Sequence, residues 1–304
     1  MAVPGRAVTD VIAVPDATGG SELRLGVALL TYNAAPQLDT VLDGIDAQVR
    51  TPDSVFVVDN GSTDETVEIC RRRGVPVVEQ ENLGVGAGHT VSIRAGLLDR
   101  RLDGLLLIEH DCIPTASCLA GVEEAMLRLR ADRIERFALS CERTHSKEDP
   151  ERIDEAQTGR PEVRITRPYR LTFNGLLVTW PLIERIGYPR TDLFVGQEDS
   201  DLMLRIERAG VLRAQVTGAV VIHDGKGRRR RGESIPLLRR EYSARNSTYR
   251  EVTSLGRPGG AARRLLGHAA ASLAPGARGT AARRLARASL AGFRGDLGEI
   301  GSRS

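Results

Sequence analysis

The chain has 304 residues, of which 41% are hydrophobic and 27% charged, and it carries a formal net charge of +3; these values are ordinary for a globular protein with one large core or two. Its four cysteines form no CxxC pair, which argues against a zinc knuckle or a disulfide framework and favours free thiols in a reducing cytoplasm. The N-terminal stretch lacks a basic segment followed by an apolar one, and no apolar run approaches the roughly 18 residues of a membrane span, so we expect an intracellular protein without a secretory signal.

Short apolar runs alternate with helical patterns in the first part of the chain. Strands are predicted at 25–30, 54–60, 75–80 and 104–111, and helices at 35–49, 62–74 and 86–101. The second of these helices is expected to start with a capping box from Ser62 to Glu65. Strands and helices that alternate with short connections predict an α/β fold with a mostly parallel central sheet and helices on both of its faces.

Polar side chains follow three of the predicted strands. They are Thr31-Tyr32-Asn33, Asp59-Asn60 and Glu109-His110-Asp111. Because ligands bind at the carboxyl ends of the strands in such sheets, these groups predict a site. The sequence has neither a Gly-x-Gly-x-x-Gly directly after the first strand nor a Gly-x-x-x-x-Gly-Lys-Ser/Thr motif, which argues against dinucleotide and P-loop sites. Glu109 and Asp111 offer the hard oxygen ligands that a divalent cation bound to a diphosphate requires, although carboxylates at strand ends also serve only as solvated or capping groups.

Eight motifs occur in order along the chain. They are TYNAAPQL (31–38), VVDNGSTDET (57–66), ENLGVGAGH (81–89), LLLIEHD (105–111), FNGLLVTWPLIERIGYP (173–189), FVGQEDSDLMLRIERAG (194–210), VIHDG (221–225) and YSARN (242–246). The series resembles the family-2 glycosyltransferases with the GT-A fold, particularly the bacterial rhamnosyltransferase- and galactofuranosyltransferase-like branch. The resemblance covers residues 23–250 and implies a nucleotide-binding half at 23–111 and an acceptor-binding half at 112–250. Residues 1–22 are expected to be a flexible N-terminal segment, and residues 251–304 a basic helical tail.

The resemblance implies which residues bind the nucleotide of a sugar donor. In such enzymes the Thr-Tyr-Asn turn, the acid of the "VVDN" strand and the Asn-Leu-Gly-x-Gly segment surround it. The corresponding positions here are Thr31, Tyr32, Asn33, Asp59, Asn82, Gly84 and Gly86. The carboxylate of Asp59 would accept a hydrogen bond from the imide N–H of uracil or thymine.

The Asp-x-Asp position of the family reads Glu109-His110-Asp111 in this chain. By resemblance, Asp111 is a ligand of a divalent cation, Mg²⁺ or Mn²⁺, and His223 matches the later metal-ligand histidine. Glu109 is one methylene longer than the usual Asp, so it either ligates the cation or hydrogen-bonds the ribose or a metal-bound water. His110 is either a nitrogen ligand or a packing residue.

The resemblance also implies the groups that act on the acceptor. Asp199, in the motif QEDSDL, matches the general base that deprotonates the acceptor hydroxyl, and Glu198 and Asp201 are expected to orient the base or the acceptor. Acids at a helix start are favoured by the helix dipole in any case. Arg245 matches the arginine of the Tyr-x-x-Arg-Asn element and is expected to contact the donor diphosphate or the acceptor.

Three further segments have a less specific pattern. The polar stretch 142–172 predicts a variable loop beside the acceptor pocket, and Trp180 is either a platform for a sugar ring or a packing residue. The arginine-rich segment 225–234 predicts either a solvated loop or one that closes over the donor. Residues 257–304 contain nine arginines and two acids, and predict one or two helices broken near Pro275. This tail is either a solvated appendage or a peripheral contact to anionic lipid or an acidic partner.

These expectations combine into a metal-dependent inverting glycosyltransferase that uses a UDP- or dTDP-sugar and a glycan, lipid-linked or small-molecule acceptor. A protein that binds sugar nucleotides without transferring them, and a nucleotidyltransferase, remain as alternatives. A nucleic-acid partner is not expected, because aromatic residues make up only 4% of the chain and the part outside the tail is acidic. We expect the protein in the cytoplasm, with contact to the inner face of the membrane as an option.

Overall fold

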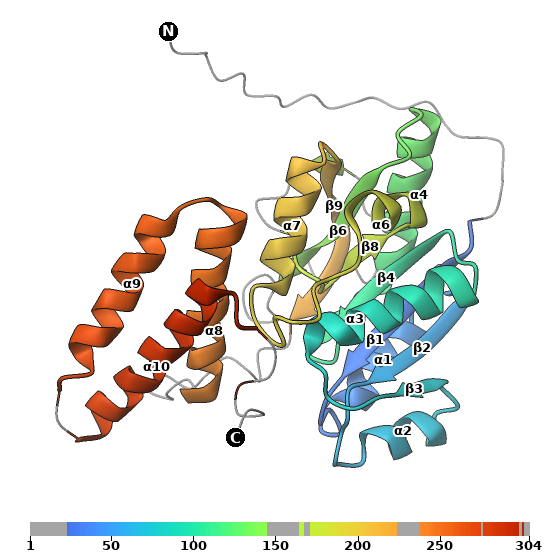
Figure 1. Cartoon of the computed structure of the whole chain (residues 1–304). Coiled ribbons are helices and arrows are strands. Elements are labelled where there is room, and N and C mark those ends of the chain that lie inside the picture. Colours follow the sequence, from blue (N-terminus) through green and yellow to red (C-terminus); the bar gives the residue numbers. More distant parts are fainter. Residues whose placement is uncertain are drawn as a thin grey trace, which may run out of the picture.

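A computed structural model describes residues 23–144, 164–166, 171–223, 237–274, 276–297 and 300. They form a central sheet with a layer of helices on each face, and a group of helices from the C-terminal part of the chain lies beside this sandwich (Figure 1). The predicted segments 1–22 and 225–234, and most of 142–172, lie outside the described residues.

Within the described residues the strands form one nine-stranded sheet. The strands are β1 Leu25–Thr31, β2 Ser54–Asp59, β3 Val77–Glu79, β4 Gly104–Glu109, β5 Cys112–Pro114, β6 Phe137–Thr144, β7 Arg164–Thr166, β8 Leu176–Val178 and β9 Leu212–His223. Their order is β3-β2-β1-β4-β8-β6-β9-β5, with β7 paired to β9. Only β5, β7 and β8 run against the common direction, so the sheet is mostly parallel, as predicted.

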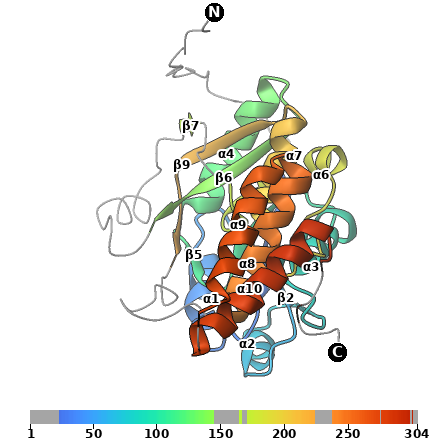
Figure 2. The ribbon, with the colours of Figure 1, turned by 60° about the vertical axis from the view of Figure 1, so that its left-hand side comes forward.

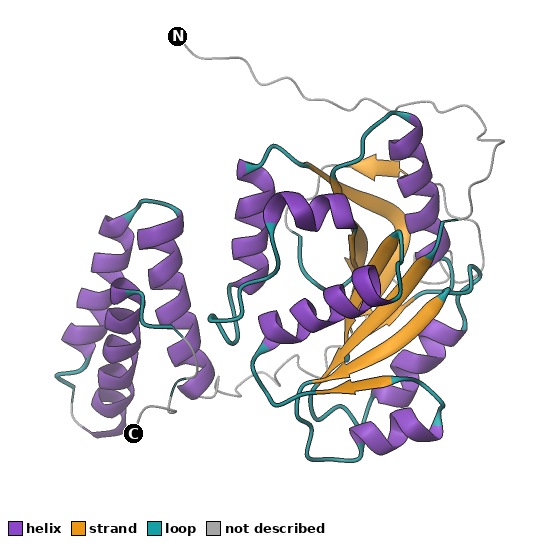
Figure 3. Cartoon of the chain, turned by 45° about the vertical axis from the view of Figure 1, so that its right-hand side comes forward, coloured by secondary structure: helices purple, strands orange, loops and turns teal. Residues whose placement is uncertain are grey.

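The sheet is buried on both faces (Figure 3). All seven residues of β1 are buried, which accounts for its continuous apolar sequence. The helices of the sandwich are α1 Leu38–Asp46, α2 Thr66–Arg72, α3 Val85–Ile93, the π-helix η1 Arg94–Asp99, α4 Cys118–Ala131, α6 Trp180–Ile186 and α7 Glu198–Arg208. One core packs α1, α2 and α4 against the sheet, and a second core packs α3, η1, α6 and α7 against its other face.

Helix α2 starts four residues later than the sequence predicts. The expected capping box does not form, because the backbone N–H and the hydroxyl of Ser62 both donate to Asp59. Asp64, two residues before the helix, accepts hydrogen bonds from the backbone N–H of Thr66 and of Ala35. The predicted helix start at Ser62 is therefore wrong.

The C-terminal helices pack against one another (Figure 2). They are α8 Leu237–Tyr249, the π-helix η3 Arg250–Ser254, α9 Pro258–Ala271 and α10 Gly276–Arg294. The break between α9 and α10 falls where the sequence predicts it. Because α8 packs against both α9 and α10, the helical group begins at residue 237, inside the range that the sequence analysis gave to the GT-A domain. Across the described residues, no helix is both long enough and apolar enough to cross a bilayer.

Candidate functional site

The turns after β1 and β2 are joined through the carboxylate of Asp59. One of its oxygens accepts from the hydroxyls of Thr31 and Ser62, and the other accepts from the backbone N–H groups of Gly61 and Ser62. The side chain of Asp59 is only 2% exposed. Both oxygens therefore have partners within the chain, so Asp59 shapes the site by fixing the two turns. This internal bonding argues against the predicted contact to the imide of a base.

The two turn residues that follow Thr31, Tyr32 and Asn33, are both exposed. Asn33 has a φ of 49°, and its side-chain oxygen accepts a hydrogen bond of 2.8 Å from the backbone N–H of Thr63. Its own N–H donates to the hydroxyl of Ser62. Tyr32, between these fixed residues, is exposed, so its ring lies at the surface at the carboxyl end of β1, where it is accessible to a ligand.

The segment between β3 and α3 packs against the backbone of residues 190–194. A Cβ atom on Gly84 would lie 2.2 Å from the carbonyl oxygen of Phe194, and one on Gly86 would lie 1.9 Å from that of Arg190. Glycine is needed at both positions because only it permits this approach. Asn82 accepts from the side chain of Asn60 and the N–H of Gly84, and so holds the segment to the end of β2.

Glu109 ends β4 and is held by two side chains that the sequence analysis did not single out. One carboxylate oxygen lies 3.3 Å from Nε2 of His89, and the other lies 3.4 Å from the amide nitrogen of Asn174. His89 is buried and stacks on Phe173. A histidine and an asparagine next to glycines in otherwise apolar segments, GAGH and FNG, were the signals that could have revealed both.

Asp111, which lies between β4 and β5, contacts His223, the last residue of β9. Strands β5 and β9 are antiparallel with Cys112 opposite His223, which brings Nε2 of His223 to 3.1 Å from the Asp111 carboxylate. Burial opposes the ionisation of Asp111, but the hydrogen bond and charge of His223 outweigh it and hold the pKa of Asp111 below its usual value. The same contact raises the pKa of His223.

The donor atoms at this point fit a divalent cation. A carboxylate oxygen and an imidazole nitrogen are suitable ligands for Mg²⁺ or Mn²⁺. The thiol sulfur of Cys112 lies within 4.8 Å of the ligand atoms of Asp111 and His223. Burial raises the pKa of that thiol far above its usual value, and the thiol donates a hydrogen bond to Asp111. The backbone N–H of His110 donates to the carbonyl of Leu30.

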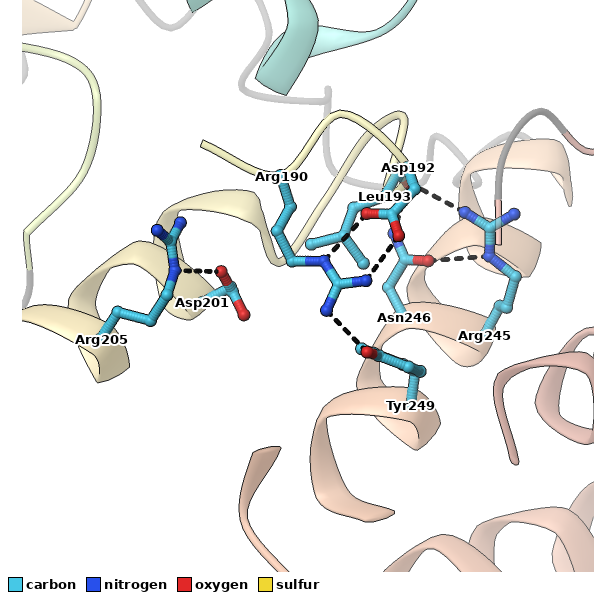
Figure 4. A network of polar contacts seen from close by, with 8 residues as sticks. All are labelled: Arg190, Asp192, Leu193, Asp201, Arg205, Arg245, Asn246 and Tyr249. Atoms are coloured by element: carbon cyan, nitrogen blue, oxygen red, sulfur yellow. Dashed lines mark hydrogen bonds and ion pairs between the residues drawn. The ribbon is translucent and has the colours of Figure 1, made fainter. Parts of the chain in front are cut away.

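The three predicted acids of α7 have different surroundings. Burial, reinforced by the charges of Asp199 and Glu109, raises the pKa of Glu198 to about 8. Asp199 is partly exposed and accepts from the N–H and hydroxyl of Ser200. Asp201 is buried and pairs with Arg205, which also donates to the carbonyl of Ile186 (Figure 4). Arg205 thus joins α7 to α6, and Asp201 holds its guanidinium.

Arg245 lies apart from any exposed surface. The residue is 2% exposed, and its guanidinium donates to Asn246 and to the carbonyl of Leu193 (Figure 4). The predicted contact of Arg245 with the donor is therefore not supported, because its charge is directed into the protein. Trp180, by contrast, is 40% exposed at the start of α6, which leaves its ring accessible to a ligand.

Residues 27–134 match the family model described as Glycosyl transferase family 2. Residues 27–134 thus resemble a family-2 glycosyltransferase domain. The galactofuranosyltransferase GlfT1 of Mycolicibacterium smegmatis is 24% identical to this chain, over 60% of this chain and 65% of the relative. The chain thus spans slightly less than two thirds of the length of that curated relative.

Solved structures share the fold of this chain. The mannosyltransferase PcManGT of Pyrobaculum calidifontis, solved with GDP-Man and Mn²⁺, has a TM-score of 0.53 and 22% identity, over 91% of this chain and 82% of that chain. TarS 1–349 of S. aureus, solved with UDP-GlcNAc, has a TM-score of 0.51 and 14% identity, over 89% and 73%. The predicted GT-A fold is confirmed by these likenesses.

Proposed function

We propose that the chain transfers a sugar from a nucleoside-diphosphate donor to an acceptor hydroxyl, and that it is a metal-dependent inverting glycosyltransferase. The observation that best supports the proposal is electrostatic: the charge of Glu109 contributes to the raised pKa of Glu198, at the start of α7, and of His223, the partner of Asp111. We take these residues to form one site.

Asp111 and His223 are the residues that would hold the cation. When bound, a divalent cation neutralises the charge that develops on a departing diphosphate. Relatives of this fold include a mannosyltransferase solved with Mn²⁺, which supports the choice of metal. Glu109 would act less directly, because His89 and Asn174 already contact its two oxygens. We assign to it the orientation of groups around the donor.

Asp199 is the acid best suited to be the general base. A base must be ionised before it accepts a proton, and the pKa of about 8 keeps Glu198 mostly protonated at neutral pH. Asp201 is engaged by Arg205. Asp199 would accept the proton of the acceptor hydroxyl as that oxygen attacks the anomeric carbon and the bond to the diphosphate breaks. A single displacement of this kind inverts the anomeric configuration.

The test is nucleotide release from a panel of UDP-, dTDP- and GDP-sugars, with Mn²⁺, Mg²⁺ or EDTA. We expect metal-dependent release from one donor, its loss in Asp111→Asn, and its retention in Asp43→Asn, a matched change at an exposed residue of α1. The NMR spectrum of the product would show an inverted anomeric centre. A retained configuration, or release that is unaffected by EDTA, would contradict the proposal.

A sugar-nucleotide-binding protein without transfer activity is the second candidate. The observation that favours it is the glutamate at position 109, whose carboxylate is engaged by His89 and Asn174. Such a protein would bind one nucleotide tightly in the presence of metal, but would leave every donor in the panel intact with any acceptor.

We also propose that the C-terminal helices contact an anionic membrane surface. The stretch from residue 257 to residue 295 contains eight arginines and no acid. Leu266 and Leu273, two apolar residues of this stretch, are exposed, and so are Arg263, Arg283 and Arg287 of the same stretch. Exposed apolar residues together with exposed basic residues are typical of peripheral attachment to anionic lipid. The acceptor would then be lipid-linked or located at the membrane.

A further inference from the structure

The segment immediately before Glu198 has an unfavourable backbone conformation. Phe194 has a φ of 64° and Gln197 a φ of 78°, and Gly196 between them has a φ of 83°. Residues other than glycine rarely adopt positive φ, and such strain persists only where surrounding contacts enforce it. The segment 193–197 therefore needs external support, because it determines where α7 and its acids begin.

Asn246 of α8 supplies that support. Its side-chain nitrogen lies 2.8 Å from the carbonyl oxygen of Leu193, 3.0 Å from that of Val195 and 2.7 Å from that of Gly196. An amide has two N–H groups, so one of them is shared. Its side-chain oxygen accepts from Nε of Arg245. Asn246 is fully buried, so these contacts are not exchanged with water.

Two neighbours strengthen the contact between α8 and this segment. Arg245 donates a second hydrogen bond to the carbonyl of Leu193, 2.9 Å away. The ring of Tyr242 stacks on that of Phe194 with centroids 5.0 Å apart. On the other side, the N–H of Val85 donates to the carbonyl of Phe194. The segment is thus held between α8 and the glycine loop at the start of α3.

Helix α10 in turn packs against α8 next to Asn246. A Cβ atom on Gly292 would lie 2.0 Å from the carbonyl oxygen of Arg245, so the two helices touch backbone to backbone next to Asn246. Arg284 of α10 forms a bidentate ion pair with Glu241 of α8. Gly292, about 90 positions after the acids of α7 in the sequence, therefore packs directly against α8, the helix that supports them.

We propose that Asn246 is a positioning residue that holds Glu198 and Asp199 in place through the 193–197 segment, and that α10 keeps Asn246 in register through Gly292. The effect on catalysis rests on the function proposed above, whereas the effect on the segment itself does not. The helical group is then part of the site's framework and not an appendage.

The direct test is hydrogen exchange of the full chain, measured for the amides of residues 193–199. Asn246→Asp keeps the shape and can pair with Arg245, but it loses both N–H donors, so we expect exchange in this segment to rise about tenfold or more. Thr248→Val is the matched control, because Thr248 is equally buried on α8 and its hydroxyl bonds only within that helix. Unchanged exchange in Asn246→Asp, or an equal rise in the control, would overturn the proposal.

A second pair of variants, at positions away from Asn246, tests the proposal even if Asn246→Asp fails to fold. Gly292→Ala should also raise exchange at 193–199, whereas Gly267→Ala, which has open space around its Cβ, should leave it unchanged. On the donor that the wild type uses, Asn246→Asp should lower kcat about tenfold with little change in KM for the donor. Absence of turnover in the wild type would defeat the proposed function but not the positioning, which the exchange data decide. A change in KM for the donor with kcat unchanged would contradict positioning of the base.

Discussion

Neighbouring acids of α7 differ in chemistry because their surroundings differ. The side chain of Glu198 is buried beside Asp199 and Glu109, and its pKa is raised to about 8. Among the described residues, no hydrogen-bond donor reaches its Oε2 atom. Asp201 has a guanidinium partner. The residue type alone therefore does not identify the base, and burial and charge do.

The buried Glu198 predicts a pH-dependent stability. Its folded pKa lies above the unfolded value of about 4.5, so between these values the folded state holds a proton that the unfolded state has lost. The free energy of unfolding should therefore fall as the pH rises from about 4.5 to 8, by on the order of a few kcal/mol. Glu198→Gln should flatten this dependence in denaturant titrations at several pH values, whereas Glu207→Gln, at an exposed position of the same helix, should not.

Sequence patterns identified most of the polar residues of the site but not the direction in which each points. Asp59 and Arg245 looked like ligand contacts. Both are turned inward, because Asp59 bonds to Thr31, Gly61 and Ser62 and Arg245 bonds to Leu193. Asp59 bonds to Gly61 and Ser62 within its own turn, but the partner of Arg245 lies 52 positions away, so that contact could not be predicted from a motif.

The glycine loop at the start of α3 gives a prediction for an element. Gly86→Ala would place a methyl group against the carbonyl of Arg190, which is backbone and cannot rotate away. We expect a loss of about 1–3 kcal/mol in the free energy of unfolding, together with weaker nucleotide binding. Gly259→Ala, where nothing surrounds the added atom, should change neither quantity in urea titrations and calorimetry. Equal effects of the two substitutions would refute this reading of the loop.

Buried parallel strands were the elements most readily predicted. The runs at β1, β2 and β4 are apolar because both faces of the sheet are covered. Strand β5 has only three residues and ends in a proline, and its partner His223 comes more than a hundred positions later. Such short non-local pairing has no sequence signal, so the meeting of Asp111 and His223 was predicted only through family resemblance.

The charge distribution of the whole molecule gives a prediction for membrane contact. Wild-type protein should sediment with vesicles that contain phosphatidylglycerol at low salt, and less so at high salt or with phosphatidylcholine alone. The double variant Leu266→Asp/Leu273→Asp should lose this binding, whereas Val49→Asp/Leu127→Asp, at exposed apolar positions outside the helical group, should keep it. Equal binding to neutral vesicles, or equal loss in both double variants, would contradict the proposed surface.

The general-base role of Asp199 is the central claim of the proposed mechanism, and turnover of Asp199→Asn on the identified donor tests it most directly. Loss of a general base should lower kcat by about 10²–10⁴ and leave metal-dependent nucleotide binding intact. Asp201→Asn is the matched comparison on the same helix, and we expect it to act mainly on stability because Asp201 pairs with Arg205. If Asp199→Asn kept turnover near that of the wild type while Asp201→Asn abolished it, the assignment of the base would be wrong.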